Sequence, residues 1–327
     1  MSDTTLGGST VLITGGTGTF GSAFLDECLE AGAGEVRIFS RDEKKQYDMA
    51  QRYRDHRNVK FFLGDVRDKR TIDSAMYGVD FVFHAAAMKQ VPSCETFPME
   101  AVKTNINGSD NVLSSAAQKR VKKVVCLSTD KAVYPTSAMG MTKAYMEKLA
   151  IQKAAQWPVE VCITRFGNLV ASRGSAVPLF IEQVQNGLPI TITEPEMTRF
   201  MMTVKEATSL VRQAFYGAKS GEILVKKAKA CTTGDIAKAV CRYLRLPEDY
   251  PVEYIGARPG EKMHEALLTE EEAEMAELRG DFMVVRQGLK PPTRLAAPYK
   301  SDEAERMSED DVLNLIQSVF DEGDGQK

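Results

Sequence analysis

The sequence predicts an α/β fold: a doubly wound parallel sheet with a smaller, partly interleaved lobe formed by the C-terminal part of the chain. Up to residue 168, short apolar or β-branched runs alternate regularly with helical patterns, which is typical of βαβ units. A glycine-rich turn directly follows the first of these runs. After residue 168 the alternation gives way to turn-rich, polar segments. We therefore expect residues 1–168 to form the sheet domain.

The first predicted strand and its turn have the pattern of a dinucleotide-binding motif. The strand covers 10–14, and the glycines after it are spaced as Gly-x-x-Gly-x-x-Gly before a helical pattern begins. Glycines let the backbone approach a pyrophosphate, and a helix N-terminus supplies free N–H donors and a partial positive charge. We therefore predict a Rossmann-type domain with cofactor contacts from Gly15, Thr17, Gly18, Thr19, Phe20 and Gly21.

The end of the second predicted strand favours NADP over NAD. An NAD-selective site usually places a carboxylate there to bind the ribose 2′-hydroxyl. Here the strand 36–39 is followed by Ser40 and Arg41, and a guanidinium can pair with a 2′-phosphate. In the alternative interpretation, Arg41 is a solvated loop residue and Asp42 only caps the next helix.

The later strand ends complete the expected cofactor site. Strands are predicted at 59–63, 80–84, 123–127 and 159–164, with helices at about 42–55, 69–77, 97–118 and 144–156. Ligands of such sheets bind at the carboxyl ends of the strands. His84 is more readily explained as a hydrogen-bonded core residue. The expected cofactor contacts from these ends and from the 97–118 helix are Asp65, Val66, Ala85, Ala86, Ala87, Lys89, Asn105 and Arg165.

The segment from Ser128 to Lys143 concentrates side chains that can transfer protons. It places Thr129, Asp130 and Lys131 directly after a buried-strand pattern, close to the start of a helix. A carboxyl in a closed cleft can have a raised pKa and stay protonated, and burial can depress the pKa of an amine. The alternative is a surface ion pair, which contributes little.

The chain after residue 168 is expected to bind the substrate. The predicted lobe comprises 169–195 and 221–300, whereas 196–220 returns to the sheet domain. Helices are predicted at 179–187, 204–217 and 233–244, a strand at 222–226, and a turn-rich segment at 191–203. The turns of this lobe contain several cationic residues, and a diphosphate ligand would need such a set. The acidic tail 301–327 contains an amphipathic piece, 312–320, that could dock on the body or on a neighbour.

Composition excludes several classes of protein. The net charge is −3 and the pI about 5.8, so nucleic acid is not expected as the main partner. The six cysteines form no CxxC pair, which favours reduced thiols in a cytoplasmic protein. The three histidines are too dispersed to indicate a metal site, so no metal is expected. No apolar run reaches the roughly 20 residues that cross a bilayer, and the N-terminus lacks the pattern of a signal peptide.

Nine segments together resemble the extended short-chain dehydrogenase/reductase superfamily, and within it the UDP-N-acetylglucosamine 4,6-dehydratases of bacterial surface-glycan synthesis. They are TGGTGTFG, FSRDE, GDVRD, HAAAMKQVP, TNINGSDNV, STDKAVYP, TRFGNLVASRGSAVP, MTRFMMT and RPGEKMHEALL. They span residues 14 to 270. The resemblance implies UDP-N-acetylglucosamine or a related nucleotide amino sugar as substrate, and a homo-oligomer, since such proteins are usually dimers or hexamers. It implies substrate contacts at Lys89, Asn168, Arg173, Pro178, Arg199, Met202, Arg258 and Glu261.

The resemblance also implies a reaction, an internal redox dehydration. NADP takes a hydride from C4 of the sugar, the ketone acidifies the C5 proton, water leaves from C5 and C6, and the hydride returns to C6. Asp130, adjacent to Thr129, matches the acid for the departing hydroxyl, and Lys131 matches the C5 base. Lys143 matches the lysine that holds the nicotinamide ribose. Burial or nearby Lys143 is expected to depress the pKa of Lys131.

Met139 departs from the superfamily pattern. The superfamily normally carries Tyr-x-x-x-Lys where this chain has Met139 and Lys143, and a thioether cannot take or give a proton. A subset of the dehydratases, including those that also invert C5, is similar to this chain in having Met there. The acceptor of the O4 proton is left open between Lys131 and an ordered water, each helped by Thr129.

Two other functions remain open from the sequence. A nucleotide-sugar 4-epimerase shares the fold and cofactor but needs neither a C6 acid nor a C5 base. A non-catalytic NADP-binding protein that has lost its tyrosine is the second alternative. Asp130 and Lys131 argue against the epimerase, and the joint presence of Thr129, Asp130, Lys131 and Lys143 argues against the non-catalytic protein.

Overall fold

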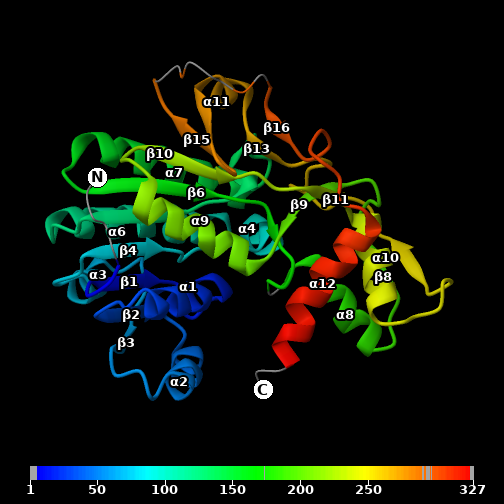
Figure 1. The fold of residues 1–327 in the computed structure, drawn as a ribbon, viewed down its shortest axis with the longest axis horizontal. Helices are drawn as coiled ribbons and strands as arrows, with labels where there is room; N and C mark the ends of the chain where they lie inside the picture. The colour runs from blue at the N-terminus through cyan, green and yellow to red at the C-terminus, as the bar shows by residue number, and fades with distance from the viewer. Residues whose placement is uncertain (1–5, 173, 289–290, 292–294, 296, 325–327) are drawn as a thin grey trace.

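A computed structural model describes residues 6–172, 174–288, 291, 295 and 297–324 of the chain (Figure 1). Its largest sheet consists of β1 (Thr10–Thr14), β2 (Glu35–Ser40), β3 (Val59–Leu63), β4 (Phe81–His84), β5 (Lys123–Leu127), β6 (Glu160–Arg165), β10 (Glu222–Lys226), β14 (Ala276–Arg279) and β15 (Phe282–Arg286). The strand order is β14-β15-β10-β6-β5-β4-β1-β2-β3. The strands from β3 to β10 run parallel, whereas β15 and β14 are added antiparallel at one edge.

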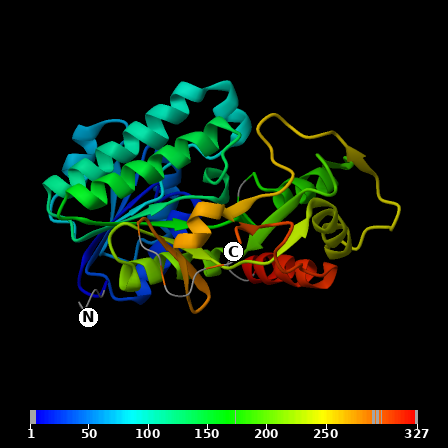
Figure 2. The same ribbon diagram turned by 90° about the horizontal axis from the view of Figure 1, so that it is seen from above.

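Helices cover both faces of this sheet, which confirms the predicted doubly wound α/β fold (Figure 2). The order β3-β2-β1-β4-β5-β6 is that of dinucleotide-binding folds. Helices α1 (Thr19–Glu30) and α9 (Val204–Gly217) pack together, and α6 (Gly108–Gln118) packs between α3 (Lys69–Ala75) and α7 (Ala138–Gln156). The shorter helices of this part are α2 (Glu43–Arg52), α4 (Val91–Thr96), α5 (Pro98–Ala101), the π-helix η1 (Val102–Asn107), the 3₁₀-helix η2 (Asp130–Ala132) and α11 (Glu270–Met275).

Aromatic side chains explain how α1 and α9 lie on the sheet. Helix α1 buries Phe20, Phe24 and Cys28 at a spacing of four residues, which makes one apolar face. The ring of Phe24 lies 4.8 Å from that of Phe83 on β4 and is stacked 5.5 Å from that of Phe215 on α9. Such ring pairs add to the stabilisation from burial. A helix from the C-terminal half of the chain therefore returns to the sheet domain.

Most of the remaining elements form a lobe with its own core. They are α8 (Ala176–Gln185), α10 (Thr233–Tyr243), α12 (Glu309–Asp324), β7 (Asn168–Leu169), β8 (Ile190–Ile192), β9 (Thr198–Met202), β11 (Ala230–Thr232) and β12 (Val252–Tyr254). The pair of β13 (Ala266–Leu268) and β16 (Tyr299–Lys300) packs instead on the core of the large sheet. Val312 and Ile316 of α12 are fully buried against α10, in one cluster with Val240. The amphipathic piece of the tail thus docks on the lobe of its own chain (Figure 1).

Three segments differ from the expectations. Helix α7 begins at Ala138 and not at 144, because the Ser137 side chain accepts from the Gly140 backbone N–H and caps it there. The segment 191–203, expected as turns, contains β9, whose polar residues are buried between β11 and β7. Within 221–300, β10, β14 and β15 join the large sheet and not the lobe. None of the described helices combines the length and apolar character needed to cross a membrane.

Candidate functional site

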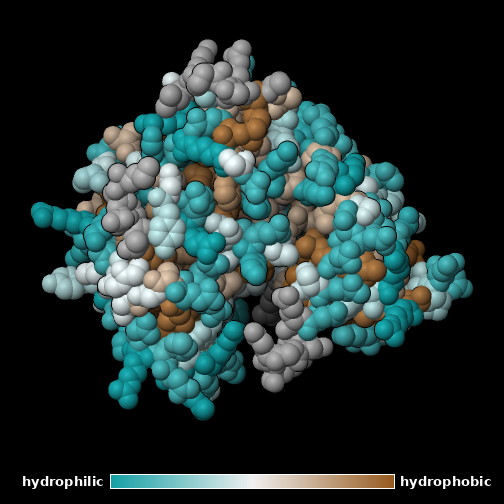
Figure 3. Space-filling view, in the orientation of Figure 1, coloured by the Kyte–Doolittle hydropathy of each residue, from teal (hydrophilic) through white to brown (hydrophobic). Residues whose placement is uncertain are grey.

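The main cavity lies where the parallel strands end. It has a volume of about 620 Å³, and the space-filling view shows the molecule hollowed between the sheet domain and the lobe (Figure 3). Strands β1 to β6 all present the residues after their carboxyl ends to this cavity. Of the residues expected to contact the cofactor, these line it: Gly15, Thr17, Gly18, Thr19, Phe20, Gly21, Ser40, Arg41, Asp65, Val66, Ala85, Ala86, Ala87, Lys89 and Lys143.

The glycine turn forms a wall without side chains. Gly15 has a φ of +68°, and a Cβ atom there would lie 2.8 Å from the Cα of Ala86. A Cβ on Gly21 would lie 2.5 Å from the Cα of Gly16. Both contacts are too short for any other residue, so the backbone itself faces the cavity beside the start of α1. This geometry fits the phosphates of a dinucleotide.

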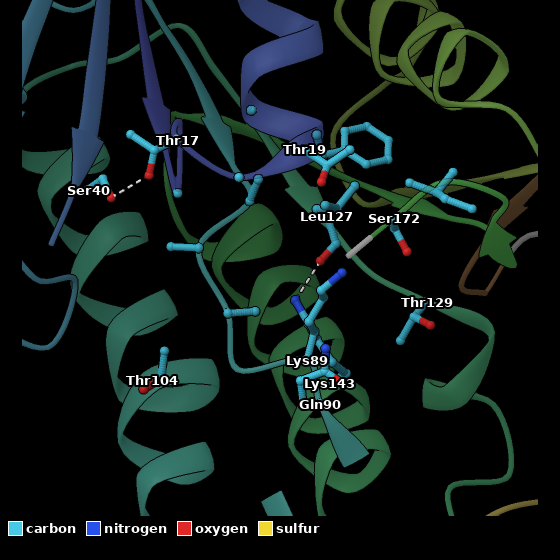
Figure 4. Close-up of a pocket in the computed structure, with 18 of the residues that line it drawn as sticks. Thr17, Thr19, Ser40, Lys89, Gln90, Thr104, Leu127, Thr129, Lys143 and Ser172 are labelled. Atoms are coloured by element: carbon cyan, nitrogen blue, oxygen red, sulfur yellow. Dashed lines mark hydrogen bonds between the residues drawn. The ribbon is translucent and has the colours of Figure 1, made fainter. Parts of the chain in front are cut away.

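A polar atom without a partner faces the same cavity. The Thr104 side chain lies on η1, is 6% exposed and lines the cavity (Figure 4). Its hydroxyl has no hydrogen-bond partner among the described residues. A buried hydroxyl without a partner is costly, so this one fits a polar group of a bound ligand. The sequence analysis did not predict Thr104 as a site residue, because the π-helix that turns it toward the cavity has no sequence signal.

The end of β2 presents cations to the cavity. The Ser40 hydroxyl lies 2.8 Å from that of Thr17, and Asp42 accepts from the Lys45 backbone N–H and so caps α2 (Figure 4). Arg41 is mostly exposed, and its guanidinium is 3.7 Å from the Asp65 carboxylate. Both Arg41 and Lys45 line the cavity. Asp42 thus caps the helix, as in the alternative interpretation, while Arg41 still faces the ligand space.

A second cavity of about 230 Å³ adjoins the first. Of the residues expected to bind substrate, it is lined by Lys89, Asn168, Arg199, Arg258 and Glu261. Lys89, Lys131 and Asn168 line both cavities, so they mark the junction. Arg173 lies outside the described residues.

The Asp130 carboxyl lies behind the wall of the cavities. It is fully buried, and its Oδ1 accepts from the Thr129 hydroxyl at 2.8 Å and from the Lys131 amine at 3.1 Å. Its Oδ2 has no hydrogen-bond partner in the part of the chain that the structure describes. Burial raises the pKa of Asp130, although Lys131 opposes this. Thr129 and Lys131, which line the main cavity, connect this carboxyl to it.

The Lys131 amine is held by three acceptors. Besides Asp130, it lies 3.1 Å from the Asn168 side-chain oxygen, to which it donates, and 3.4 Å from the Glu265 carboxylate. Burial alone would lower the pKa of Lys131, but the Asp130 and Glu265 carboxylates outweigh burial and raise it. The expected depression by Lys143 is therefore wrong in this structure.

The amine with a lowered pKa is that of Lys143. Its Nζ donates to the Leu127 carbonyl at 2.7 Å, and burial lowers its pKa to about 8 (Figure 4). Met139 lies four residues earlier on the same face of α7, lines the main cavity and packs with Cys94 and Ala101. A Cβ on Gly140 would lie 2.3 Å from the Lys131 carbonyl oxygen. This glycine therefore lets α7 approach the turn 128–131, which we call the reactive turn.

Comparison with known proteins defines the family. Residues 11–287 match the sequence profile of a family described as "Polysaccharide biosynthesis protein". The chain belongs to this family. Its fold and relatives place it among extended short-chain dehydrogenase/reductases of the nucleotide-sugar dehydratase and epimerase type.

Similar family members include a UDP-glucose 4-epimerase of Rickettsia rickettsii (strain Sheila Smith), 45% identical over 326 residues, with 94% of this chain and 95% of that protein covered. A UDP-glucose 4-epimerase of Rickettsia typhi (strain ATCC VR-144 / Wilmington) is 50% identical over 280 residues, covering 84% and 81%. The X-ray structure of Pen from Bacillus thuringiensis has a TM-score of 0.91 at 38% identity, covering 96% and 99%. The structure of DesIV, a dTDP-glucose 4,6-dehydratase from Streptomyces venezuelae with NAD and TYD bound, has a TM-score of 0.71 at 22% identity, covers 78% and 86%, and shares the fold.

Four residues predicted for the site lie elsewhere in this family member. The Arg165 guanidinium is buried between Glu147 and Glu272 and lines neither cavity. Asn105 also lies behind the wall, where it bonds to the Met88 backbone and to Thr142. Met202 points into the core of the sheet domain, and Met201 lines the second cavity in its place. Pro178 does not line that cavity, whereas its neighbours Val177 and Leu179 do.

Within the described residues, no cluster of three or more His, Cys, Asp or Glu side chains has the arrangement of a metal site. The buried acidic residue that the sequence analysis missed is Glu265, 2% exposed and on the wall of the second cavity. Burial alone would raise its pKa, but Lys131 and Lys262 lower it to about 2. It lies in the RPGEKMHEALL segment, but no spacing rule marks it out.

We expect Gly15→Ala to prevent dinucleotide binding, because the new methyl group would displace the Ala86 backbone from the cavity wall. Gly32→Ala is the matched control, since Gly32 has a similar φ of +74° but no atom within 4 Å of its Cβ position. Both changes should cost about 1–2 kcal/mol of stability from backbone strain. Calorimetric titration with the oxidised dinucleotide should show at least tenfold weaker binding for Gly15→Ala only. Equal affinities of the two variants would contradict the assignment of the turn.

Proposed function

We propose that this protein is a nucleotide-sugar 4,6-dehydratase that converts UDP-N-acetylglucosamine, or a related nucleotide amino sugar, to a 4-keto-6-deoxy sugar for surface polysaccharide or glycan synthesis. The observation that carries the proposal is the pairing of Lys131, at the junction of the two cavities, with the buried Asp130 behind it. Loss of water from a sugar needs one group that removes the C5 proton and one that protonates the C6 hydroxyl. The pair offers an amine and a carboxyl in hydrogen-bond contact.

We propose NADP as the bound cofactor of this reaction. The glycine turn, the Thr104 hydroxyl and the cations Arg41 and Lys45 form the cavity that would hold it. A nicotinamide dinucleotide bound there supplies a hydride acceptor for C4 of the sugar and a hydride donor for C6. Lys143, on the opposite wall near Leu127, would hold the nicotinamide ribose.

One internal proton transfer would prepare both catalytic groups. In the charged pair, Lys131 is an ammonium and Asp130 a carboxylate, and neither form suits the proposed reaction. Transfer of one proton from Lys131 to Asp130 gives the neutral amine that removes the C5 proton and the carboxyl that protonates the C6 oxygen. The buried position of Asp130 and its unpaired Oδ2 favour the protonated carboxyl. The Thr129 hydroxyl, which donates to Asp130 Oδ1, lines the main cavity next to this carboxyl.

The acceptor of the O4 proton must be a group other than Met139. We propose Lys131 or an ordered water, helped by Thr129, and the structure adds Lys143 to these candidates. The pKa of Lys143 is lowered to about 8 by burial, so part of this lysine is a neutral amine near neutral pH. Lys143 and Met139 lie on the same wall of the main cavity.

A UDP-sugar 4-epimerase is the second candidate, because the Rickettsia relatives carry that name. It would use the same cavities but return the hydride to C4 without loss of water. The Asp130–Lys131 pair would then have no C6 or C5 step to perform. This difference makes the product the deciding observation.

Incubation of the purified protein with UDP-N-acetylglucosamine in deuterated water should give a product that has lost one water. Mass spectrometry detects this loss, and NMR reports deuterium at C5 and the configuration of that carbon. UDP-glucose is the control substrate. A product of unchanged mass that differs only at C4 would show an epimerase, and recovery of both sugars intact would contradict each proposal.

We expect Asp130→Asn to slow dehydration by about 10²–10⁴-fold, because an amide cannot supply a proton to the C6 oxygen. Oxidation at C4 should persist, so reduced nicotinamide should accumulate and be visible by its absorbance. Asp80→Asn, a change at the opposite ends of the strands where Asp80 bonds to Thr10, is the control. Dehydration by Asp130→Asn at the unaltered rate would remove Asp130 from the mechanism.

Arg41→Ala should weaken NADP+ binding by at least about tenfold and leave NAD+ binding nearly unchanged, because only NADP carries the 2′-phosphate that a guanidinium can pair with. Arg54→Ala removes an exposed cation that does not line the cavity and serves as the control. Titration of the cofactor-free protein with each dinucleotide measures the four affinities. Tighter binding of NAD+ than of NADP+ by the unaltered protein would contradict the NADP proposal.

A further inference from the structure

The Glu265 carboxylate lies in the segment before β13 and joins the ion cluster around Lys131. Its Oε1 lies 3.4 Å from the Lys131 amine, and its Oε2 lies 2.8 Å from the Lys262 amine. The side chain is 3% exposed and forms part of the wall of the second cavity. Burying a carboxylate in this way is costly unless cations pair with it. Glu265 therefore needs both lysines, and it lies between them.

The backbone around Glu265 is held by the lobe. The Glu265 N–H donates to the Ser301 hydroxyl at 2.8 Å, and this hydroxyl lies 2.5 Å from that of Thr198 on β9. The neighbouring His264 bonds to the same Thr198 side chain. Lys131, in contrast, is carried by η2 at the end of β5 in the sheet domain. The ion pair thus connects a fixed point of the lobe to the reactive turn.

We propose that Glu265 is a positioning residue, which holds the Lys131 amine at the junction of the two cavities and keeps it protonated until substrate binds. The inference deepens the proposed function and rests on it only in taking Lys131 as a reacting amine. Glu265 itself does not exchange a proton. It acts through the position and charge of Lys131.

The charges that face Lys131 come from several elements. Asp130 on η2 and Glu265 before β13 favour the ammonium, whereas Arg199 on β9 opposes it, and Lys262 faces the far side of Glu265. Removal of the Glu265 charge would leave Asp130 alone against two cations. The pKa of Lys131 should then fall, since an anion that stabilised its charged form is gone. The neutral amine is the base, so the rising limb of activity with pH should move to lower pH.

The test measures the protonation of Lys131 directly. Trace labelling with acetic anhydride at a series of pH values, followed by peptide mass spectrometry, gives the pH at which half of Lys131 is reactive. Glu265→Gln keeps the shape of the side chain, and we expect it to lower this midpoint by about one pH unit. Glu222→Gln is the matched control, because Glu222 is also a buried carboxylate paired with a cation, Arg279, but lines neither cavity. An unchanged midpoint in Glu265→Gln would overturn the proposal.

A second variant should shift the labelling midpoint of Lys131 in the opposite direction. Lys262→Met removes the cation that shares Glu265, so the carboxylate acts on Lys131 alone and the midpoint should rise. This variant carries the test if Glu265→Gln does not fold. A fall or no change in the midpoint of Lys262→Met would contradict the proposed arrangement of charges.

Activity separates this inference from the proposed function. If the unaltered protein removes water, Glu265→Gln should lower kcat with little change in KM and shift the pH profile of kcat in the same direction as the labelling midpoint. If the protein releases no dehydrated product but the midpoint still shifts, the proposed function fails and the role of Glu265 stands. If the unaltered protein removes water but the midpoint does not shift in Glu265→Gln, the proposed function stands and the role of Glu265 fails.

Discussion

The arrangement of the site depends on one constraint: a largely buried ammonium needs acceptors for its donors. Lys131 has three donors, and it finds acceptors in Asp130, Asn168 and Glu265. These belong to η2, to β7 and to the segment before β13, which are far apart in sequence. Satisfying one amine therefore brings three segments to one point and fixes where the two cavities meet. Loss of any acceptor would leave one donor of this ammonium without its partner.

A second buried ion group, formed by Arg165, Glu147 and Glu272, supports the segment that carries Lys131. The Arg165 guanidinium makes paired contacts with Glu147 of α7 and with Glu272 of α11, which suits its planar, forked set of donors. Ser128, at the start of the reactive turn, donates to the same Glu147. Arg165 thus holds α7 against β6, and α7 carries Lys143 and Met139 on the same face as Glu147, at steps of four residues. The position of Arg165 at a strand end indicated a ligand contact. In the structure Arg165 instead holds α7, the helix that lines the cavity.

The sequence predicted those parts of the fold and the site that depend on local patterns. Alternating strands and helices determine the parallel sheet, and the ends of parallel strands must meet at one edge, so Gly15, Ser40 and Asp65 could be placed together without coordinates. Long-range pairing could not be predicted in this way. Asn105 was expected to contact the cofactor, but its partners are the Met88 backbone and the Thr142 side chain.

The ion cluster around Lys131 is a clearer example of long-range pairing that the sequence does not predict. Whether Lys131 is charged depends on a carboxylate from a distant segment, and no rule of spacing connects the two. The expected partner, Lys143, is instead the amine whose pKa is lowered, because burial there outweighs the opposing charge of Glu147. Two lysines near each other in sequence therefore have opposite pKa shifts, because at Lys131 the Asp130 and Glu265 carboxylates outweigh burial.

The different surroundings of Lys131 and Lys143 explain how the wall of the main cavity can contain the thioether of Met139. Met139 packs with Cys94 and Ala101 and adds neither a charge nor a proton to the cavity. Burial lowers the pKa of Lys143 to about 8, although the charge of Glu147 opposes this. A buried lysine with such a pKa exchanges a proton near neutral pH at little cost, as a general base must. Met139 thus lies one turn from Lys143, a side chain on the same helix face that can titrate.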